Sequence, residues 1–193
     1  MKLCDIICPK IMVNDEMARI RTGKDAITVE IMCICLLRWL SGGSYLDIRL
    51  SAGINPAKFY SCVYKCIDAI LESADLAYKF PSTEKEVDEA AQGFESLSTH
   101  VGIKGCVACL DGYFLQTKVP ASGETGNVKS YISGHYQTYG INVHAACNHR
   151  CRFVYAAVAA PGGTNDVSAF KKTKLSQMIQ KLPPRRFDVG DNA

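Results

Sequence analysis

The sequence predicts an α/β protein, α+β overall, in which a helical N-terminal region precedes a domain built on a mixed sheet. In the first 80 residues, apolar side chains recur at three- and four-residue spacing, as on the buried face of a helix. In the second half, short apolar runs are bounded by glycine, proline and asparagine, which is typical of strands. The 193 residues are 48% hydrophobic and 21% charged, a composition that argues against general disorder.

Three segments follow from these patterns. We expect a helical region over residues 1–80, a connector helix within 81–100 and a sheet domain over 101–193, with the main boundary near Lys79 to Ser82. Residues 1–25 are polar and interrupted by Pro9 and Gly23, so we expect irregular structure there. Thr83 and Glu86 have the spacing of a capping box that opens the connector helix.

The N-terminal region has the pattern of a helix-turn-helix. A helix is predicted from Ala26 to Leu40, a short one from Ser44 to Leu50, and a third after Asn55, with Pro56 in its first turn. The short turn before the third helix suits either a DNA-binding helix-turn-helix or a plain helical bundle with solvated lysines. In the first case, polar side chains from the N-terminal half of the third helix would contact DNA, namely Lys58, Ser61 and Lys65.

The C-terminal domain is predicted to contain strands that carry an aspartate at their ends. The first strand runs from Cys106 and ends at Asp111-Gly112, and the last runs from Arg186 to Asp191. Between them we expect an antiparallel hairpin, made by residues 141–147 and 151–160, and then a helix from Val167 to Leu182.

Asp111 and Asp191 are the leading candidates for chemistry. Two carboxylates side by side on a sheet suit Mg²⁺ or Mn²⁺, which prefer oxygen ligands, and suit two-metal phosphoryl transfer. The alternative for each is a turn-forming aspartate, because Asp-Gly is a common turn signal. Asp166 is a further candidate metal ligand, but capping the following helix explains it fully, with Thr164 and Asn165 as competing caps.

Ten cysteines raise the question of a metal site or a disulfide framework. Most occupy apolar positions of predicted helices and strands, where a free cysteine acts as a small buried hydrophobe. Cys147 and Cys151 flank the most ligand-like cluster, which fits a tight turn better than a structural zinc site. The net charge of +3 is too small to indicate nucleic-acid binding by itself. We expect a soluble intracellular protein without a signal peptide or membrane span.

The second half of the chain resembles Harbinger-type transposases, which are DDE superfamily endonucleases. The resemblance runs through residues 105–112 (GCVACLDG), 133–143 (SGHYQTYGINV), 151–153 (CRF), 161–166 (PGGTND) and 189–193 (VGDNA). It covers essentially all of 101–193, and the helical half also resembles the helix-turn-helix region of the family.

The resemblance implies an RNase H-like fold in which Asp111 and Asp191 are the first two catalytic, metal-binding acids. It implies metal-dependent hydrolysis of DNA phosphodiesters followed by strand transfer, a nuclear location and a separate DNA-binding partner protein. Two features depart from the family: Tyr113 and Phe114 follow Gly112 where the family often has Thr-His, and the third acid, a glutamate on a later helix, has no counterpart. We therefore expect a C-terminally incomplete domain that is inactive as a nuclease; the alternative is a non-catalytic DNA-binding remnant or a domesticated derivative.

Overall fold

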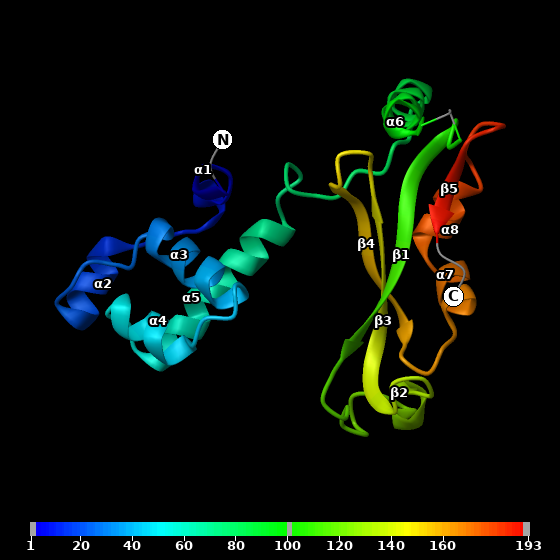
Figure 1. Ribbon diagram of the computed structural model, residues 1–193. Helices are drawn as coiled ribbons and strands as arrows, with labels where there is room; N and C mark the ends of the chain where they lie inside the picture. The colour runs from blue at the N-terminus through cyan, green and yellow to red at the C-terminus, as the bar shows by residue number, and fades with distance from the viewer. Residues whose placement is uncertain (1–2, 100–101, 191–193) are drawn as a thin grey trace. The chain divides into compact units, whose positions relative to one another are not determined.

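The structure is a computed structural model that describes residues 3–99 and 102–190. The chain divides into two compact units, residues 1–77 and residues 78–193 (Figure 1). Unit 1 contains α1 (Leu3–Ile7), η1 (Cys8–Lys10), α2 (Asp15–Thr22), α3 (Val29–Leu40), α4 (Tyr45–Ser51) and α5 (Pro56–Leu71). Unit 2 contains α6 (Glu84–Leu97), β1 (Cys106–Gln116), η3 (Val128–Tyr131), β2 (Ile132–Ser133), β3 (Thr138–Cys147), β4 (Phe153–Pro161), α7 (Asp166–Lys171), α8 (Lys174–Ile179) and β5 (Phe187–Gly190). The predicted α+β class is confirmed.

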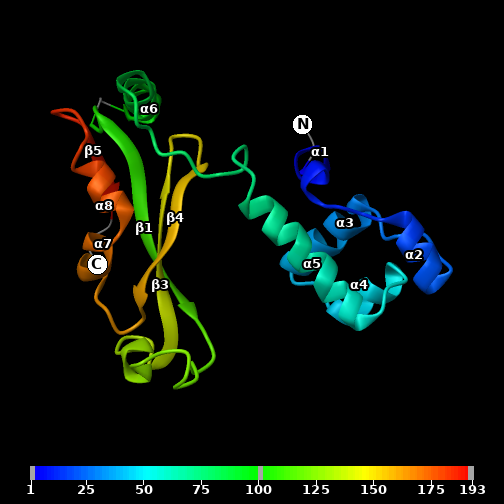
Figure 2. The same cartoon turned by 180° about the vertical axis from the view of Figure 1, so that it is seen from behind.

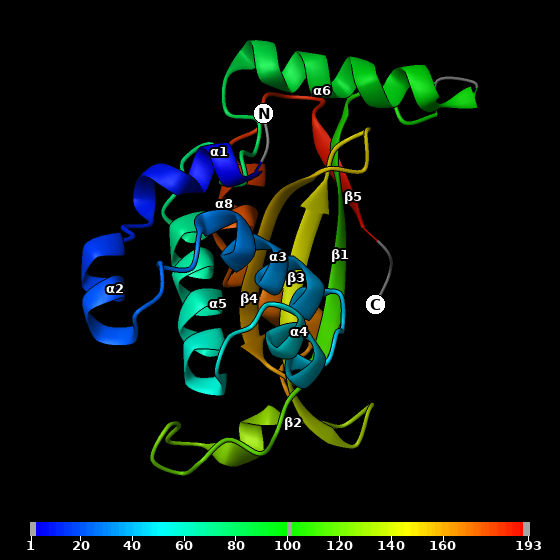
Figure 3. The same cartoon turned by 90° about the vertical axis from the view of Figure 1, so that its left-hand side faces the viewer.

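Unit 1 is held together by one apolar core. Side chains from α1, α3, α4 and α5 meet in it, and Phe59, Leu36 and Ile7 are fully buried at its centre. The predicted helices are present, and their starts are set by caps. The Thr28 side chain accepts a hydrogen bond from the Ile31 amide at the start of α3, and Asn55 Oδ1 accepts one from the Lys58 amide at 2.8 Å at the start of α5. Figure 3 shows α5, the longest helix of this unit.

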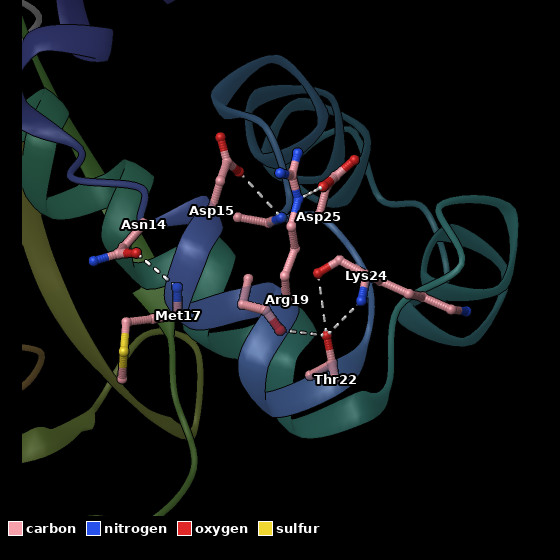
Figure 4. A network of polar contacts seen from close by, with 9 residues as sticks. Asn14, Asp15, Met17, Arg19, Thr22, Lys24 and Asp25 are labelled. Atoms are coloured by element: carbon pink, nitrogen blue, oxygen red, sulfur yellow. Dashed lines mark hydrogen bonds and ion pairs between the residues drawn. The ribbon is translucent and has the colours of Figure 1, made fainter.

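Two helices, α1 and α2, lie within residues 1–25, where irregular structure was expected. Asn14 caps α2 by accepting a hydrogen bond from the Met17 amide at 2.8 Å, and Gly23 ends it in a left-handed conformation with φ of 66° (Figure 4). An ion pair between Arg19 and Asp25 ties the helix to the segment that follows. The expectation was wrong for α2 because this helix has no buried residue, so its sequence lacks the apolar periodicity that marks the other helices.

Unit 2 is built on a mixed sheet with the strand order β4-β3-β1-β5, and β2 pairs with one end of β3. The predicted hairpin of β3 and β4 is confirmed as an antiparallel pair. β1 is antiparallel to β3 but parallel to β5, with Leu110 opposite Gly190 at the last described pair. A parallel neighbour requires a crossover connection, and α7 and α8 provide it between β4 and β5.

Helices pack against both faces of this sheet. Leu175 of α8 and Phe170 of α7 pack on Ala108 and Ala146, and Figures 1 and 2 show α7 and α8 together on one side of β1. We call this surface the α7 face. Val87 and Ala90 of α6 pack on Val107, whose side chain points the other way, and α6 crosses the end of the sheet where β1 begins (Figures 1 and 3).

Two expectations about helices in this unit have different outcomes. The capping box of α6 is confirmed: Glu86 accepts hydrogen bonds from the Thr83 and Ser82 amides, and these bonds lower the pKa of Glu86 to about 2. The single helix expected from Val167 to Leu182 is instead two short helices. The break occurs because the Thr173 hydroxyl caps α8 by accepting a hydrogen bond from the Ser176 amide. Among the described residues, no helix is long and apolar enough to cross a membrane.

Candidate functional site

A cleft of about 900 Å³ lies in unit 2 where β1, β3, the turn after β2 and the start of α7 come together. Asp111 and Gly112 border it from β1, Asn142 and His144 from β3, and Asp166 from α7. The cleft therefore combines titratable side chains from segments that are distant in the sequence.

Asp111 lies in the middle of β1, whereas the sequence predicted it at the exit of the strand. β1 continues through Gly112 to Gln116 because the residues after the glycine keep pairing with β3, as Tyr113 does with Val143. Asp111 itself is opposite Ala145, and its side chain is exposed. Pairing of β1 with β3 continues before and after Asp111 along the strand, and this pairing fixes the backbone that carries the carboxylate.

Asp166 is the first residue of α7, but it does not make the capping hydrogen bond. That bond is made by Asn165, whose Oδ1 accepts from the Ser168 amide at 2.8 Å. Asp166 instead lies beside His144 over Gly112. A Cβ atom added to Gly112 would be 3.6 Å from His144 Nε2 and 3.9 Å from Asp166 Cγ, so both side chains lie next to this position of β1.

His144 is the buried titratable group of the cleft. It is 3% exposed, and its Nδ1 has no hydrogen-bond partner among the described residues. Burial lowers the pKa of His144, and the nearby Asp166 carboxylate partly opposes this effect. The neighbouring Asn142 is also buried, and its Nδ2 donates to the Thr164 carbonyl at 2.7 Å, which holds β3 against the turn before α7. The proximity of His144 to Asp166 depends on packing between segments that are distant in the sequence.

The two aspartates of the cleft lie on different faces of β1. Gly112 shares the α7 face with His144 and Asp166. Because side chains alternate along a strand, Asp111 points to the opposite face together with Cys109 and Tyr113. We call this surface the Asp111 face. Asp111 and Asp166 thus border one cleft but do not form a facing carboxylate pair.

The predicted partner of Asp111, Asp191, lies outside the described residues. Gly190, which precedes it in the sequence, borders the cleft and is paired with Leu110, which precedes Asp111. Within residues 3–99 and 102–190, no group of three or more histidine, cysteine, aspartate or glutamate side chains is placed to hold a metal ion. Asp111 offers the oxygen donors that Mg²⁺ and Mn²⁺ prefer, but the described residues do not complete a metal site.

The candidate DNA-binding residues lie on α5 of unit 1. Lys58 and Lys65 are exposed and Ser61 is half-buried, and their spacing of three and four residues puts them on one side of the helix. α4 and α5 are joined by a short turn around Gly53, which has φ of 67°. These positions suit a contact surface.

The cysteines are all free. Cys33, Cys35, Cys62 and Cys66 are buried in the core of unit 1, as expected for small apolar side chains. Cys147 and Cys151 flank the turn between β3 and β4, which is closed by hydrogen bonds between Asn148 and Arg152.

Comparison with known proteins gives one similarity. No family model matches the chain, and no solved structure matches it. The human protein described as "Putative nuclease HARBI1" is 23% identical over 170 residues, which are 88% of this chain and 46% of that protein. The chain therefore spans just under half the length of this relative. The similarity supports a Harbinger-like nuclease relationship, in agreement with the motifs of the second half of the chain.

Proposed function

We propose that this chain is a nuclease module of the DDE type, derived from a transposase, and that Asp111 and Asp191 are its first two metal ligands. The observation that carries the proposal is the parallel pairing of β5 with β1. The last described pair is Leu110 opposite Gly190, so β5 runs beside β1 up to the residue before each of the two candidate acids. The similarity to a human nuclease supports the same class of activity.

The register of the sheet supports the choice of Asp191 over Asp166 as the partner of Asp111. Residues that are directly opposite in neighbouring strands point to the same face of a sheet. Gly190 and Leu110, which precede Asp191 and Asp111 in the sequence, are direct partners in this register. Asp166 lies on the α7 face with His144. The mixed sheet, with its helical crossover, also supports the RNase H-like fold.

The chain's own contribution to catalysis would be to hold carboxylates rigidly beside a DNA phosphodiester. Asp111 is fixed by pairing of β1 with β3, and it is exposed enough for a phosphate to approach. A divalent cation, Mg²⁺ or Mn²⁺, supplies activation of water and stabilisation of the negative charge that develops on phosphate oxygens. Strand transfer by a freed 3′ hydroxyl belongs to the same proposal.

Unit 1 would supply DNA contacts through a helix-turn-helix made by α4 and α5. Lys58 and Lys65 are exposed cations on one side of α5, and Ser61 lies between them. Such contacts make affinity fall steeply with salt, because phosphate binding releases counterions. A separate DNA-binding partner protein and a nuclear location are further parts of the proposal.

The proposal is tested by metal-dependent nicking of supercoiled plasmid by the 193-residue chain in Mn²⁺. The missing third acid predicts no nicking by this chain; if the two acids suffice for activity, nicking is slow, and both chelation and Asp111→Asn abolish it while plasmid affinity stays the same. Glu124→Gln is the matched control, because Glu124 lies in an exposed loop where it accepts a hydrogen bond from the Ala121 amide. Nicking that persists in Asp111→Asn would overturn the assignment of this residue.

A second candidate function is a non-catalytic DNA-binding remnant or domesticated derivative. The observation that favours it is the lack of a three-donor metal group among the residues that the structure describes. In this case the chain binds DNA with a steep salt dependence, nicks no plasmid at any Mn²⁺ concentration, and is unaffected by Asp111→Asn.

A further inference from the structure

Cys109 and Cys147 are direct partners across the antiparallel pair β1 and β3. The Cα atoms of direct partners in an antiparallel pair are about 4.5 or 5.5 Å apart, depending on the type of pair. Disulfides span Cα separations of about 4.4–6.8 Å. Both types of pair fall within this range, so the backbone spacing permits a bond between the two thiols.

Two further thiols, Cys106 and Cys151, lie near this pair and are the competing partners. Cys109 and Cys147 are both free and half-buried, so a small oxidant can reach them. Cys106, the third thiol of this region, is fully buried, and burial raises its pKa to about 11, which keeps it in the unreactive protonated form. Cys151 is exposed, but it is separated from Cys147 by a tight turn in which its amide donates to the Asn148 carbonyl at 2.9 Å.

We infer that Cys109 and Cys147 form a reversible cross-strand disulfide when the protein meets a two-electron oxidant of the peroxide class. Hydrogen peroxide oxidises one thiol to a sulfenic acid and releases one water. The second thiol then attacks that sulfur, which forms the S–S bond and releases a second water. Two electrons pass from the two thiols to the peroxide, and a dithiol reductant returns them by exchange.

The bond would lie next to the candidate site. Asp111 follows Cys109 by two residues and shares its face of β1, so the disulfide would covalently tie β1 to β3 beside this carboxylate. The inference does not depend on the proposed nuclease function, because it concerns only the chemistry of the two thiols.

The test uses the whole 193-residue chain, treated with hydrogen peroxide, alkylated with iodoacetamide, digested with trypsin without reduction and analysed by mass spectrometry. Arg150 separates Cys147 from Cys151, so trypsin places them in different peptides, while Cys106 and Cys109 share the peptide 105–118. We expect peptide 105–118 linked to peptide 130–150, with fragmentation assigning the bond to Cys109. Alkylation of Cys109 and Cys147 should be lost after peroxide and restored by dithiothreitol.

Two variants test which cysteines form the bond. Cys109→Ser should abolish the linked peptide pair, and the exposed control Cys151→Ser should leave its yield unchanged. Circular dichroism spectra that match the parent protein establish that both variants are folded. A bond from Cys147 to Cys151, a bond assigned to Cys106, or full alkylation of both cysteines after peroxide would each overturn the inference.

Discussion

The helical unit and the sheet unit bury their apolar side chains in different ways. In unit 1, the first helix, α1, and the last helix, α5, pack around one continuous core centred on Phe59. In unit 2, the sheet separates two smaller clusters, one under α7 and α8 and one under α6. Where α6 does not cover the Asp111 face, large apolar side chains of the described residues are exposed. Tyr113 is 66% exposed and Val158 is 63% exposed.

These two arrangements leave different surfaces available for function. A helical bundle with one core has only its outer surface for binding, so its candidate residues, Lys58 and Lys65, lie on the exposed side of α5. A sheet presents alternate side chains to two faces, so β1 buries Ala108 in a core and still presents Asp111 to solvent. The same strand therefore stabilises the fold and holds the candidate carboxylate.

Phe59→Ala should have the largest effect on the helical unit. Phe59 is fully buried and packs near Tyr45, with ring centroids 6.2 Å apart, so its truncation should lower the free energy of unfolding by about 3–5 kcal/mol. Trp39 is the only tryptophan of the chain and packs against this core, so its fluorescence in urea reports the transition. Leu71→Ala, at a position 77% exposed, is the control and should change stability by less than about 0.5 kcal/mol. Equal effects of the two substitutions would refute the single-core description.

Gly140→Ala should have a smaller effect, confined to the sheet unit. A Cβ atom at this position would collide with the Phe114 ring and would lie 2.5 Å from the Leu115 carbonyl oxygen, and backbone atoms cannot move aside cheaply. We expect a loss of about 1–3 kcal/mol, seen as faster hydrogen exchange in peptides from β1 and β3. Gly126→Ala is the matched control, because an added Cβ there meets no atom within 4 Å. Unchanged exchange in Gly140→Ala would mean that β1 and β3 are not packed as described.

Local patterns predicted α3, α5, α6 and the hairpin well. α3, α5 and α6 combine apolar spacing with caps at Thr28, Asn55 and Thr83, and each of these signals lies within a few residues of the element that it starts. The β3–β4 hairpin was predictable for the same reason, since its turn is short.

Other features depend on contacts that the sequence does not display. The Asp111-Gly112 pair is a common turn signal, but pairing with β3 overrides it and keeps β1 extended. Asp166 lies beside His144 and over Gly112 because the chain turns from β4 into α7 at this point. This turn brings together residues that are 54 positions apart in the sequence (166 − 112 = 54). The sequence indicated Asp111 as a candidate, and only the register assigned it to the face opposite Asp166.

We propose that the Asp111 face, and not the α7 face, binds the divalent cation. Mn²⁺ binding by the 193-residue chain, followed by electron paramagnetic resonance, tests it most directly with the variants Asp111→Asn and Asp166→Asn. We predict that Asp111→Asn weakens Mn²⁺ binding by at least about tenfold, or about 1.4 kcal/mol, and that Asp166→Asn leaves the affinity within about twofold. Unchanged binding in Asp111→Asn, or a loss that occurs only in Asp166→Asn, would contradict the claim.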